Sequence, residues 1–323
     1  MAGEAKAGFD AERDQAGGGV TLARISACIA VYNGAQHLAT AIRSVQTQTV
    51  PVDEILVLDD GSTDDSLTVA RGFEGVRVVS QPNGGIGAAR RALVEQAQGD
   101  WIAFCDHDDW WEPNRIEVGK PFTADPETVL IYSGVWHVDE NGIETEYPLR
   151  NPQNAPSIDH VVPNPEDIWT SSTLLRRQTI LDVGNFNPFF RTGEDMLMWF
   201  QLGGRGKIVQ IPQRLVHMSR RQGSTSAANR KQYEYAVALY DKEVLPNLAR
   251  WYPNLGEAKL AECRRLLEAK VGYTMALLAA HCEKDGERAA ALDLYRRARK
   301  LAPKSRGVLY RYVRSLMHFP VNP

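Results

Sequence analysis

The sequence predicts an α/β fold in which helices cover a mostly parallel β-sheet and an α-helical extension follows. Two observations support this prediction. In the first half of the chain, short apolar runs alternate with segments of helical periodicity, as they do in strand–helix–strand units. After Ser226 the strand patterns end and helical periods take over. We therefore expect a flexible segment at 1–22, a sheet domain at 23–226 and a helical extension at 227–323.

The expected strands are short apolar runs bounded by polar residues: 24–31, 55–58, 76–79, 101–105 and 129–135. Two segments between them place apolar residues on one helical face: 35–47 and 88–97. Four prolines between residues 151 and 165 predict an irregular crossing. The helices expected in the extension are 227–248, 256–282, 287–301 and 304–317, with breaks at Pro246, Pro253 and Pro303.

Composition limits the class of protein. The chain of 323 residues is long enough for a full core, and its net charge of -3 argues against a nucleic-acid partner. The four cysteines lack C-x-x-C spacing, so we expect them to be reduced and structural. The first 20 residues do not resemble a signal peptide, and no apolar run reaches the roughly 18 residues of a membrane span. A cytoplasmic protein is the expectation.

Polar side chains concentrate where the expected strands end. Tyr32 and Asn33 follow the first strand, and the segments 59–62, 83–85 and 106–109 follow the next three. The carboxyl ends of parallel strands meet at one edge of a sheet, which is where such sheets bind ligands. We expect the binding site at this edge.

Three carboxylates end the fourth expected strand. Side chains two residues apart in an extended segment point the same way, so Asp106 and Asp108 can reach one cation while Asp109 faces elsewhere. A divalent ion that also holds a diphosphate would offset the repulsion between these acids. The alternative is an acidic loop that simply caps the strand.

Two further segments at this edge suit a nucleotide. Asp60 could accept hydrogen bonds from a base or ribose while Tyr32 stacks on the base, although residues 59–64 could equally form a turn and a helix cap. The pattern Gly85-x-Gly87-x-x-Arg90 has arginine in place of the third glycine of a dinucleotide fingerprint. An arginine there suits a diphosphate, or else is a solvated surface residue.

Later polar residues supply a candidate base and a candidate metal ligand. Glu194 and Asp195 precede an apolar helix start, where they could cap the helix or, for Asp195, take a proton from an attacking hydroxyl. The basic segment 214–226 could close over a diphosphate or be a plain surface loop. His217, within it, is a candidate third metal ligand, although a lone histidine is more often structural.

These residues, in this order, resemble a family 2 glycosyltransferase with the nucleotide-sugar-binding GT-A fold. The similarity runs from about residue 25 to 226 and comprises six blocks: 30–33, 55–64, 83–90, 106–109, 184–188 and 194–195. Ala30, Arg91 and Gln222 depart from the residues usual in the family. The Q-x-x-R-W signature of processive synthases is absent, which favours addition of a single sugar.

The resemblance implies an inverting, metal-dependent transfer of one sugar from a nucleoside diphosphate, most commonly UDP, to an acceptor hydroxyl. It assigns Asp195 as the base and Asp108 as the ligand of Mn²⁺ or Mg²⁺. The expected nucleotide-sugar site comprises Ala30, Tyr32, Asn33, Asp60, Arg90, Asp106, His107 and Glu194. A glycan or lipid-linked acceptor in cell-surface glycan synthesis is the expected partner.

The helical extension ends in a basic segment. Residues 288–314 contain nine Lys or Arg against one acid, Asp293, interleaved with aromatic and aliphatic residues. A helical cap that packs on the catalytic domain and a peripheral contact with the inner face of an anionic plasma membrane are both open. Residues 287–303 resemble one helix of a tetratricopeptide pair, but a single copy is not a repeat array.

Two other functions are weighed against the transferase. A catalytically silent nucleotide-sugar or glycan binder, whose extension recruits a partner, is disfavoured by the joint presence of Arg90, Asp108 and Asp195. A dinucleotide-dependent oxidoreductase is disfavoured by Arg90 at the third glycine position.

Overall fold

The protein is described here by a computed structural model that covers residues 23–151, 155–190, 192–220 and 230–316. The expectations for 1–22 and for a boundary at residue 226 lie outside these residues. The sheet has the strand order β3-β2-β1-β4-β8-β6-β9-β5, and β7 pairs with β6. Its strands are β1 Ile25–Val31, β2 Glu54–Asp59, β3 Val76–Ser80, β4 Trp101–Phe104, β5 Trp110–Trp111, β6 Thr128–Val138, β7 Glu144–Glu146, β8 Thr173–Arg176 and β9 Lys207–Ser219.

The α/β prediction is confirmed, and the two halves of the sheet differ in direction. β3, β2, β1 and β4 are parallel neighbours. β8 then runs antiparallel between β4 and β6, and β5 and β7 also pair antiparallel, whereas β6 and β9 are parallel. Every residue of β1 is buried, as expected for a strand that is covered on both faces.

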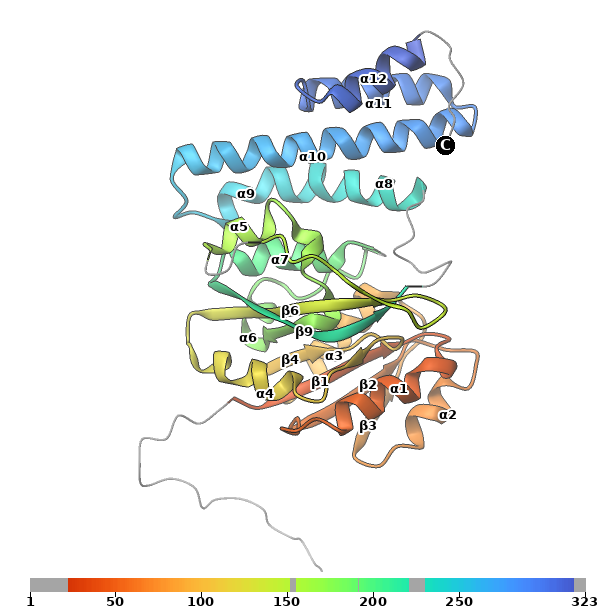
Figure 1. The fold of residues 1–323 in the computed structure, drawn as a ribbon, viewed down its shortest axis with the longest axis vertical. Helices are drawn as coiled ribbons and strands as arrows, with labels where there is room; N and C mark the ends of the chain where they lie inside the picture. Colours follow the sequence, from red (N-terminus) through yellow and green to blue (C-terminus); the bar gives the residue numbers. More distant parts are fainter. Residues whose placement is uncertain (1–22, 152–154, 191, 221–229, 317–323) are drawn as a thin grey trace, which may run out of the picture.

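Helices cover both faces of the sheet (Figure 1). Alternate residues of β1 point to opposite faces: Ile29 joins the core beneath α1, and Cys28 joins the core beneath α3 and α7. The helices of this part are α1 Ala35–Gln46, α2 Ser66–Arg71, α3 Ile86–Gln96, α4 Arg115–Gly119, α5 Ser157–Val161, α6 Arg177–Asp182 and α7 Glu194–Gly203. Short 3₁₀ turns are η1 Lys120–Ala124, η2 Pro165–Asp167 and η3 Thr170–Ser172. The predicted irregular crossing at 151–165 therefore holds a short helix, α5, which that prediction missed.

The helical extension stacks on the α7 side of the sheet (Figure 1). Its elements are α8 Arg230–Ala238, the π-helix η4 Leu239–Val244, α9 Leu245–Trp251, α10 Glu257–Lys284, α11 Arg288–Leu301 and α12 Arg306–Leu316. One apolar core runs without interruption from Leu56 in the sheet through Trp199 in α7 to Tyr295 in α11. The extension is thus packed on the sheet domain through a shared core.

The prediction of a break at Pro246 is wrong, because the chain stays helical from α8 through α9. Proline lacks the amide hydrogen of a helical turn and clashes with the carbonyl four residues earlier. The wider π turn directly before Pro246 accommodates both defects. The breaks at Pro253 and Pro303 are confirmed, since both prolines lie between helices.

All four cysteines are free and buried, two in the sheet domain and two in α10: Cys28, Cys105, Cys263 and Cys282. This agrees with the expectation of reduced, structural thiols. Within the described residues, none of the helices combines the length and apolar character that a bilayer crossing requires.

Candidate functional site

Arg90 joins three elements at the carboxyl edge of the sheet. It lies on α3, and its Nη2 donates to Oδ1 of Asp106, just past β4, over 2.9 Å. Its Nη1 donates to Oε1 of Glu194, the first residue of α7. Three predicted site residues that are far apart in sequence are therefore in contact, with the Arg90 guanidinium held by two carboxylates.

Three acids surround this one cation. Burial alone would lower the pKa of Arg90, but the charges of Asp106, Glu194 and Asp195 outweigh it and raise that pKa. Burial raises the pKa of Glu194 to about 7, and the charge of Asp195 adds to this while Arg90 opposes it. Near neutral pH Glu194 is therefore partly protonated, whereas an isolated glutamate would have released its proton.

Asp195 stands at the N-terminus of α7, where its side chain is half-buried. Its Oδ2 accepts a hydrogen bond from Oγ1 of Thr170 over 3.1 Å, and its Oδ1 accepts from the amide of Met196 over 2.7 Å. The residue before the helix is Gly193, at φ 80°, a backbone conformation that favours glycine. The helix start and Thr170 together orient the predicted base.

Hydrogen bonds from Ser171 and Ser219 to Asp109 hold the acidic loop 106–109, and the sequence did not predict them. Ser171 Oγ donates to Oδ2 of the buried Asp109 over 2.5 Å and accepts from the amide of Asp106 over 3.0 Å. The amide of Ser219, at the end of β9, donates to Oδ1 over 3.1 Å. Burial raises the pKa of Asp109, and the charges of Asp106 and Asp108 add to this. Asp109 thus fixes the loop from within. The expectation of an extended segment here is wrong, because 106–109 forms a turn in which the Asp109 amide donates to the Asp106 carbonyl over 3.0 Å. Asp106 contacts Arg90, whereas Asp108 lines a cavity whose walls do not include Asp106.

The predicted nucleoside side of the site lies at the ends of β1 and β2. Ala30 is buried in β1, whereas Tyr32 is 49% exposed and free to offer a ring face. Asp60 is buried, and its carboxylate accepts from Gln81 Nε2 over 2.7 Å and from the amides of Gly84 and Gly85 over 3.0 and 2.8 Å. Asp60 therefore shapes the glycine loop that leads into α3.

Asn33 and His107 line the junction with α1. Asn33 has a left-handed backbone with φ 51°, and its Oδ1 accepts from the amide of Thr63 over 2.8 Å. The His107 ring packs so closely on Gly34 that a Cβ at that glycine would lie 2.1 Å from His107 Cδ2. Glycine at position 34 lets the histidine lie over the start of α1.

Asp108 opens onto a cavity of about 470 Å³ between α1, the β6–β7 hairpin and the end of β9. The cavity is lined by Gln36, His37, Thr40, Asp108, Trp110, Val138, Asp139, Glu140, Gly142 and Ser219. Among the residues described, no group of three or more His, Cys, Asp or Glu side chains is arranged to hold a metal ion. Mg²⁺ usually binds one or two carboxylates together with substrate phosphates and water, so Asp108 fits such a site in its chemistry.

His217 lies elsewhere than the prediction of a third metal ligand requires. It is buried on β9, where its ring stacks on Trp110 at 5.1 Å and faces Trp136 at 6.5 Å between centroids. Its Nε2 lies 2.8 Å from Glu112 and its Nδ1 lies 3.0 Å from Glu144. Its Nε2 is hydrogen-bonded to Glu112 and its Nδ1 faces Glu144 rather than Asp108, which disfavours His217 as a metal ligand.

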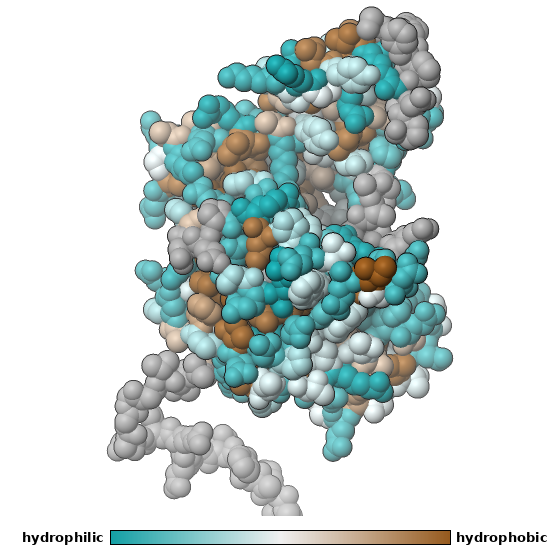
Figure 2. Space-filling view, viewed as in Figure 1, coloured by the Kyte–Doolittle hydropathy of each residue, from teal (hydrophilic) through white to brown (hydrophobic). Residues whose placement is uncertain are grey.

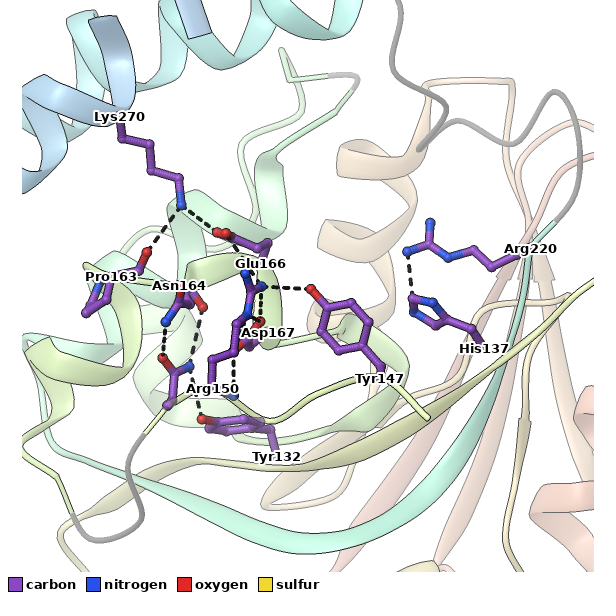
Figure 3. A network of polar contacts seen from close by, with 11 residues as sticks. Tyr132, His137, Tyr147, Arg150, Pro163, Asn164, Glu166, Asp167, Arg220 and Lys270 are labelled. Carbon is purple, nitrogen blue, oxygen red and sulfur yellow. Dashed lines mark hydrogen bonds and ion pairs between the residues drawn. The ribbon is translucent and has the colours of Figure 1, made fainter. Parts of the chain in front are cut away.

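A second polar network connects the site to the extension (Figure 3). Arg150, which follows the β6–β7 hairpin, donates through Nε to Asp167 over 3.0 Å and through Nη2 to the Tyr147 hydroxyl over 2.8 Å. Lys270 of α10 pairs with Glu166 at 2.5 Å in the same 3₁₀ turn, η2. This turn leads within a few residues to Thr170 and so links α10 to the partner of the predicted base.

Aromatic side chains pack next to the turn η2, around Trp169. The Trp169 ring contacts His137 and Tyr147 edge-on, each at 5.4 Å between centroids. The guanidinium of Arg220 lies 4.7 Å from the centre of the Trp169 ring, and its Nη2 lies 3.3 Å from His137 Nε2 (Figure 3). All three partners of Trp169 come from other elements of the fold.

The family model described as glycosyl transferase family 2 matches residues 26–191, half of the chain. The chain belongs to this family. The matched span includes Asp60, Arg90 and the loop 106–109, and it ends just before Glu194 and Asp195.

Other glycosyltransferases are similar to part of this chain. An uncharacterized glycosyltransferase of Rickettsia conorii is 32% identical over 186 residues, covering 55% of this chain and 31% of that protein. Chondroitin synthase of Pasteurella multocida is 36% identical over 123 residues, covering 36% of this chain and 13% of that protein. The chain thus spans less than a third of these relatives' length.

Solved structures with the same fold extend the similarity into the helices. Residues 1–349 of Staphylococcus aureus TarS match with a TM-score of 0.63 at 15% identity over 90% of each chain. The complex of that protein with UDP-GlcNAc matches with a TM-score of 0.60 at 16% identity, over 88% of this chain and 92% of the other. The prediction of a GT-A fold with a C-terminal helical extension is confirmed.

Proposed function

We propose that this glycosyltransferase moves one sugar from a UDP-sugar to an acceptor hydroxyl with inversion, and that Asp195 is the base. The observation that carries the proposal is the meeting of Arg90, Asp106 and Glu194 at the sheet edge, with Asp195 adjacent to them. The complexes of TarS with UDP and UDP-GlcNAc support the choice of UDP.

Each side chain has a distinct task in this mechanism. Tyr32 offers a ring face to the uracil, while Asp60 shapes the loop beside it. Arg90 supplies the positive charge that the diphosphate meets beside Asp106. Asp195, oriented by Thr170, accepts the proton of the acceptor hydroxyl as that oxygen attacks the anomeric carbon.

Asp108 would hold Mn²⁺ or Mg²⁺. When bound, such an ion neutralises charge that develops on the leaving diphosphate. We place the protein in the cytoplasm, acting on a glycan or lipid-linked acceptor in cell-surface glycan synthesis. The name of the Pasteurella relative, chondroitin synthase, supports a glycan acceptor.

A donor screen tests the proposal. Wild type, Asp108→Ala and Asp195→Asn are compared by thermal shift and by donor turnover with UDP-, GDP- and dTDP-sugars in the presence of Mn²⁺. We expect a UDP-sugar to stabilise wild type, Asp108→Ala to lose the Mn²⁺-dependent stabilisation, and Asp195→Asn to keep it while turnover falls about 10²- to 10⁴-fold.

Asp182→Asn is the matched control, since Asp182 is exposed at the end of α6, and it should turn over donor like wild type. Binding of a nucleotide sugar without turnover in wild type would favour the silent binder. Absence of any Mn²⁺-dependent response would contradict both the donor and the metal assignments.

A further inference from the structure

The end of the molecule formed by α11 and α12 carries an apolar helix face in the open. On α12, Leu309 is 41%, Tyr310 65% and Val313 38% exposed. Residues three, four and seven apart share one side of a helix, so these three lie together, and Arg306 lies one turn before Tyr310 on the same side. Figure 2 shows apolar side chains beside hydrophilic ones at this end.

The opposite side of α12 is the one that packs on the protein. Val308 and Ser315, seven residues apart, are buried against the remaining helices. The apolar side chains of α12 therefore extend around more of the helix than the side that packs on the protein, and Leu309, Tyr310 and Val313 face solvent. A surface helix normally turns its apolar stripe to the core and its charges outward.

The two helices at this end, α11 and α12, are rich in basic residues. Residues 288–314 contain nine Lys or Arg against the single acid Asp293, whereas the whole chain has a net charge of -3. A helix with exposed aliphatic and tyrosine side chains and flanking arginines suits the boundary between anionic headgroups and acyl chains.

We infer that the exposed face of α12, together with Arg306, attaches this protein peripherally to an anionic membrane surface. Leu309, Tyr310 and Val313 enter the headgroup boundary, and the basic residues meet lipid phosphates. The face lies at the end of the molecule away from β3, across the stacked helices (Figure 1). The inference does not depend on the proposed transferase chemistry.

Vesicle flotation of the full chain tests this, with phosphatidylcholine alone and with an equimolar mixture of phosphatidylcholine and phosphatidylglycerol. We expect flotation with the anionic vesicles that weakens at high salt. Leu309→Ser/Val313→Ser should lower the partition coefficient about tenfold or more, and Arg306→Gln about fivefold. Both variants should retain the donor binding of wild type, since α12 is remote from the sheet edge.

Matched controls come from α10, where Leu266 and Arg265 are exposed. Leu266→Ser and Arg265→Gln should float like wild type. Absence of flotation in wild type, or unchanged flotation of Leu309→Ser/Val313→Ser, would overturn the inference. So would a lipid-free dimer that this double variant dissociates in sedimentation velocity, because the face would then bind a second copy.

Discussion

The carboxyl edge of the sheet and the exposed face of α12 depart from the usual distribution of polarity in opposite directions. At the sheet edge Arg90, Glu194 and Asp109 are buried, whereas on α12 Leu309 and Tyr310 face solvent. Charged side chains are rarely buried unless paired, and apolar patches on a surface commonly mark a contact. Neither arrangement is needed to fold an α/β domain.

The two regions should therefore respond differently to substitution. Buried charges at the sheet edge stabilise one another, so removal of one leaves the others without compensation. Side chains on the exposed face of α12 lose little area on folding, so their replacement should leave the folded state nearly unchanged. Stability measurements separate these two behaviours.

The largest expected effect is that of Arg90→Met, because it leaves the buried Glu194 carboxylate without its cation. We expect a loss of about 3–5 kcal/mol in the free energy of unfolding, measured by urea denaturation. Arg115→Met is the matched control. Arg115 is equally buried, but among the described residues its guanidinium has one hydrogen bond, to the Thr173 carbonyl over 2.8 Å.

Burial lowers the pKa of Arg115 to about 9, so its charge is a cost to the fold. Its replacement removes that cost along with one hydrogen bond and the contact of the guanidinium with the Trp111 ring at 4.0 Å, and we expect a change within about 2 kcal/mol. Equal losses for the two variants would show that pairing with carboxylates does not distinguish Arg90 from Arg115.

A smaller effect is expected from pH, through Glu194. Its pKa is raised to about 7 in the folded protein, so the folded state binds a proton that the unfolded chain has released. This contribution is complete below the ordinary glutamate pKa of 4.5 and is lost as the pH rises through about 7. Relative to Glu194→Gln, wild type should lose about 2–3 kcal/mol of stability across this interval.

Urea denaturation of both proteins at several pH values measures this difference. A constant difference from acid to neutral pH would mean that Glu194 titrates as an ordinary glutamate. A difference that grows in favour of wild type as the pH rises would mean that Arg90 outweighs burial.

The smallest effect is expected on α12. Tyr310→Ser should change the free energy of unfolding by less than about 0.5 kcal/mol, because the ring is largely exposed. Val308→Ala, two residues earlier on the buried side of the same helix, should cost about 2 kcal/mol. Similar losses in both variants would show that Tyr310 is part of the folded core and would remove the contrast with the sheet edge.

Local pattern was enough to predict β1, β2, β3, β4 and β6 and to place the candidate site residues at strand ends, but it did not predict β5, β7, β8 or β9. The apolar run of β1 and the polar residues directly after it are short-range signals, whereas the alternation expected from Asp106 to Asp108 was wrong because that segment turns. Such signals show which side chains lie on a strand and which lie at its end. Because parallel strands run in the same direction, the side chains at their ends are expected together at the carboxyl edge of the sheet.

Partners that come from distant segments could not be predicted in this way. Glu194 reaches Arg90 across 104 positions, and Glu112 reaches His217 across 105. The antiparallel entry of β8 between β4 and β6 brings Ser171 to Asp109, and no feature near either residue signals it. The break expected at Pro246 does not occur. Helix propensity describes only the local sequence, whereas the burial of side chains in η4 and α9 stabilises the helix through this segment.

The buried cysteines give this protein its own probes of local opening. Cys28 and Cys105 report on the sheet domain, and Cys263 and Cys282 report on α10. Burial raises the pKa of all four thiols, so an alkylating reagent reacts with each one chiefly when the surrounding structure opens. Labelling rates followed by mass spectrometry can thus tell whether the sheet and the helical extension open together or separately, without an engineered label.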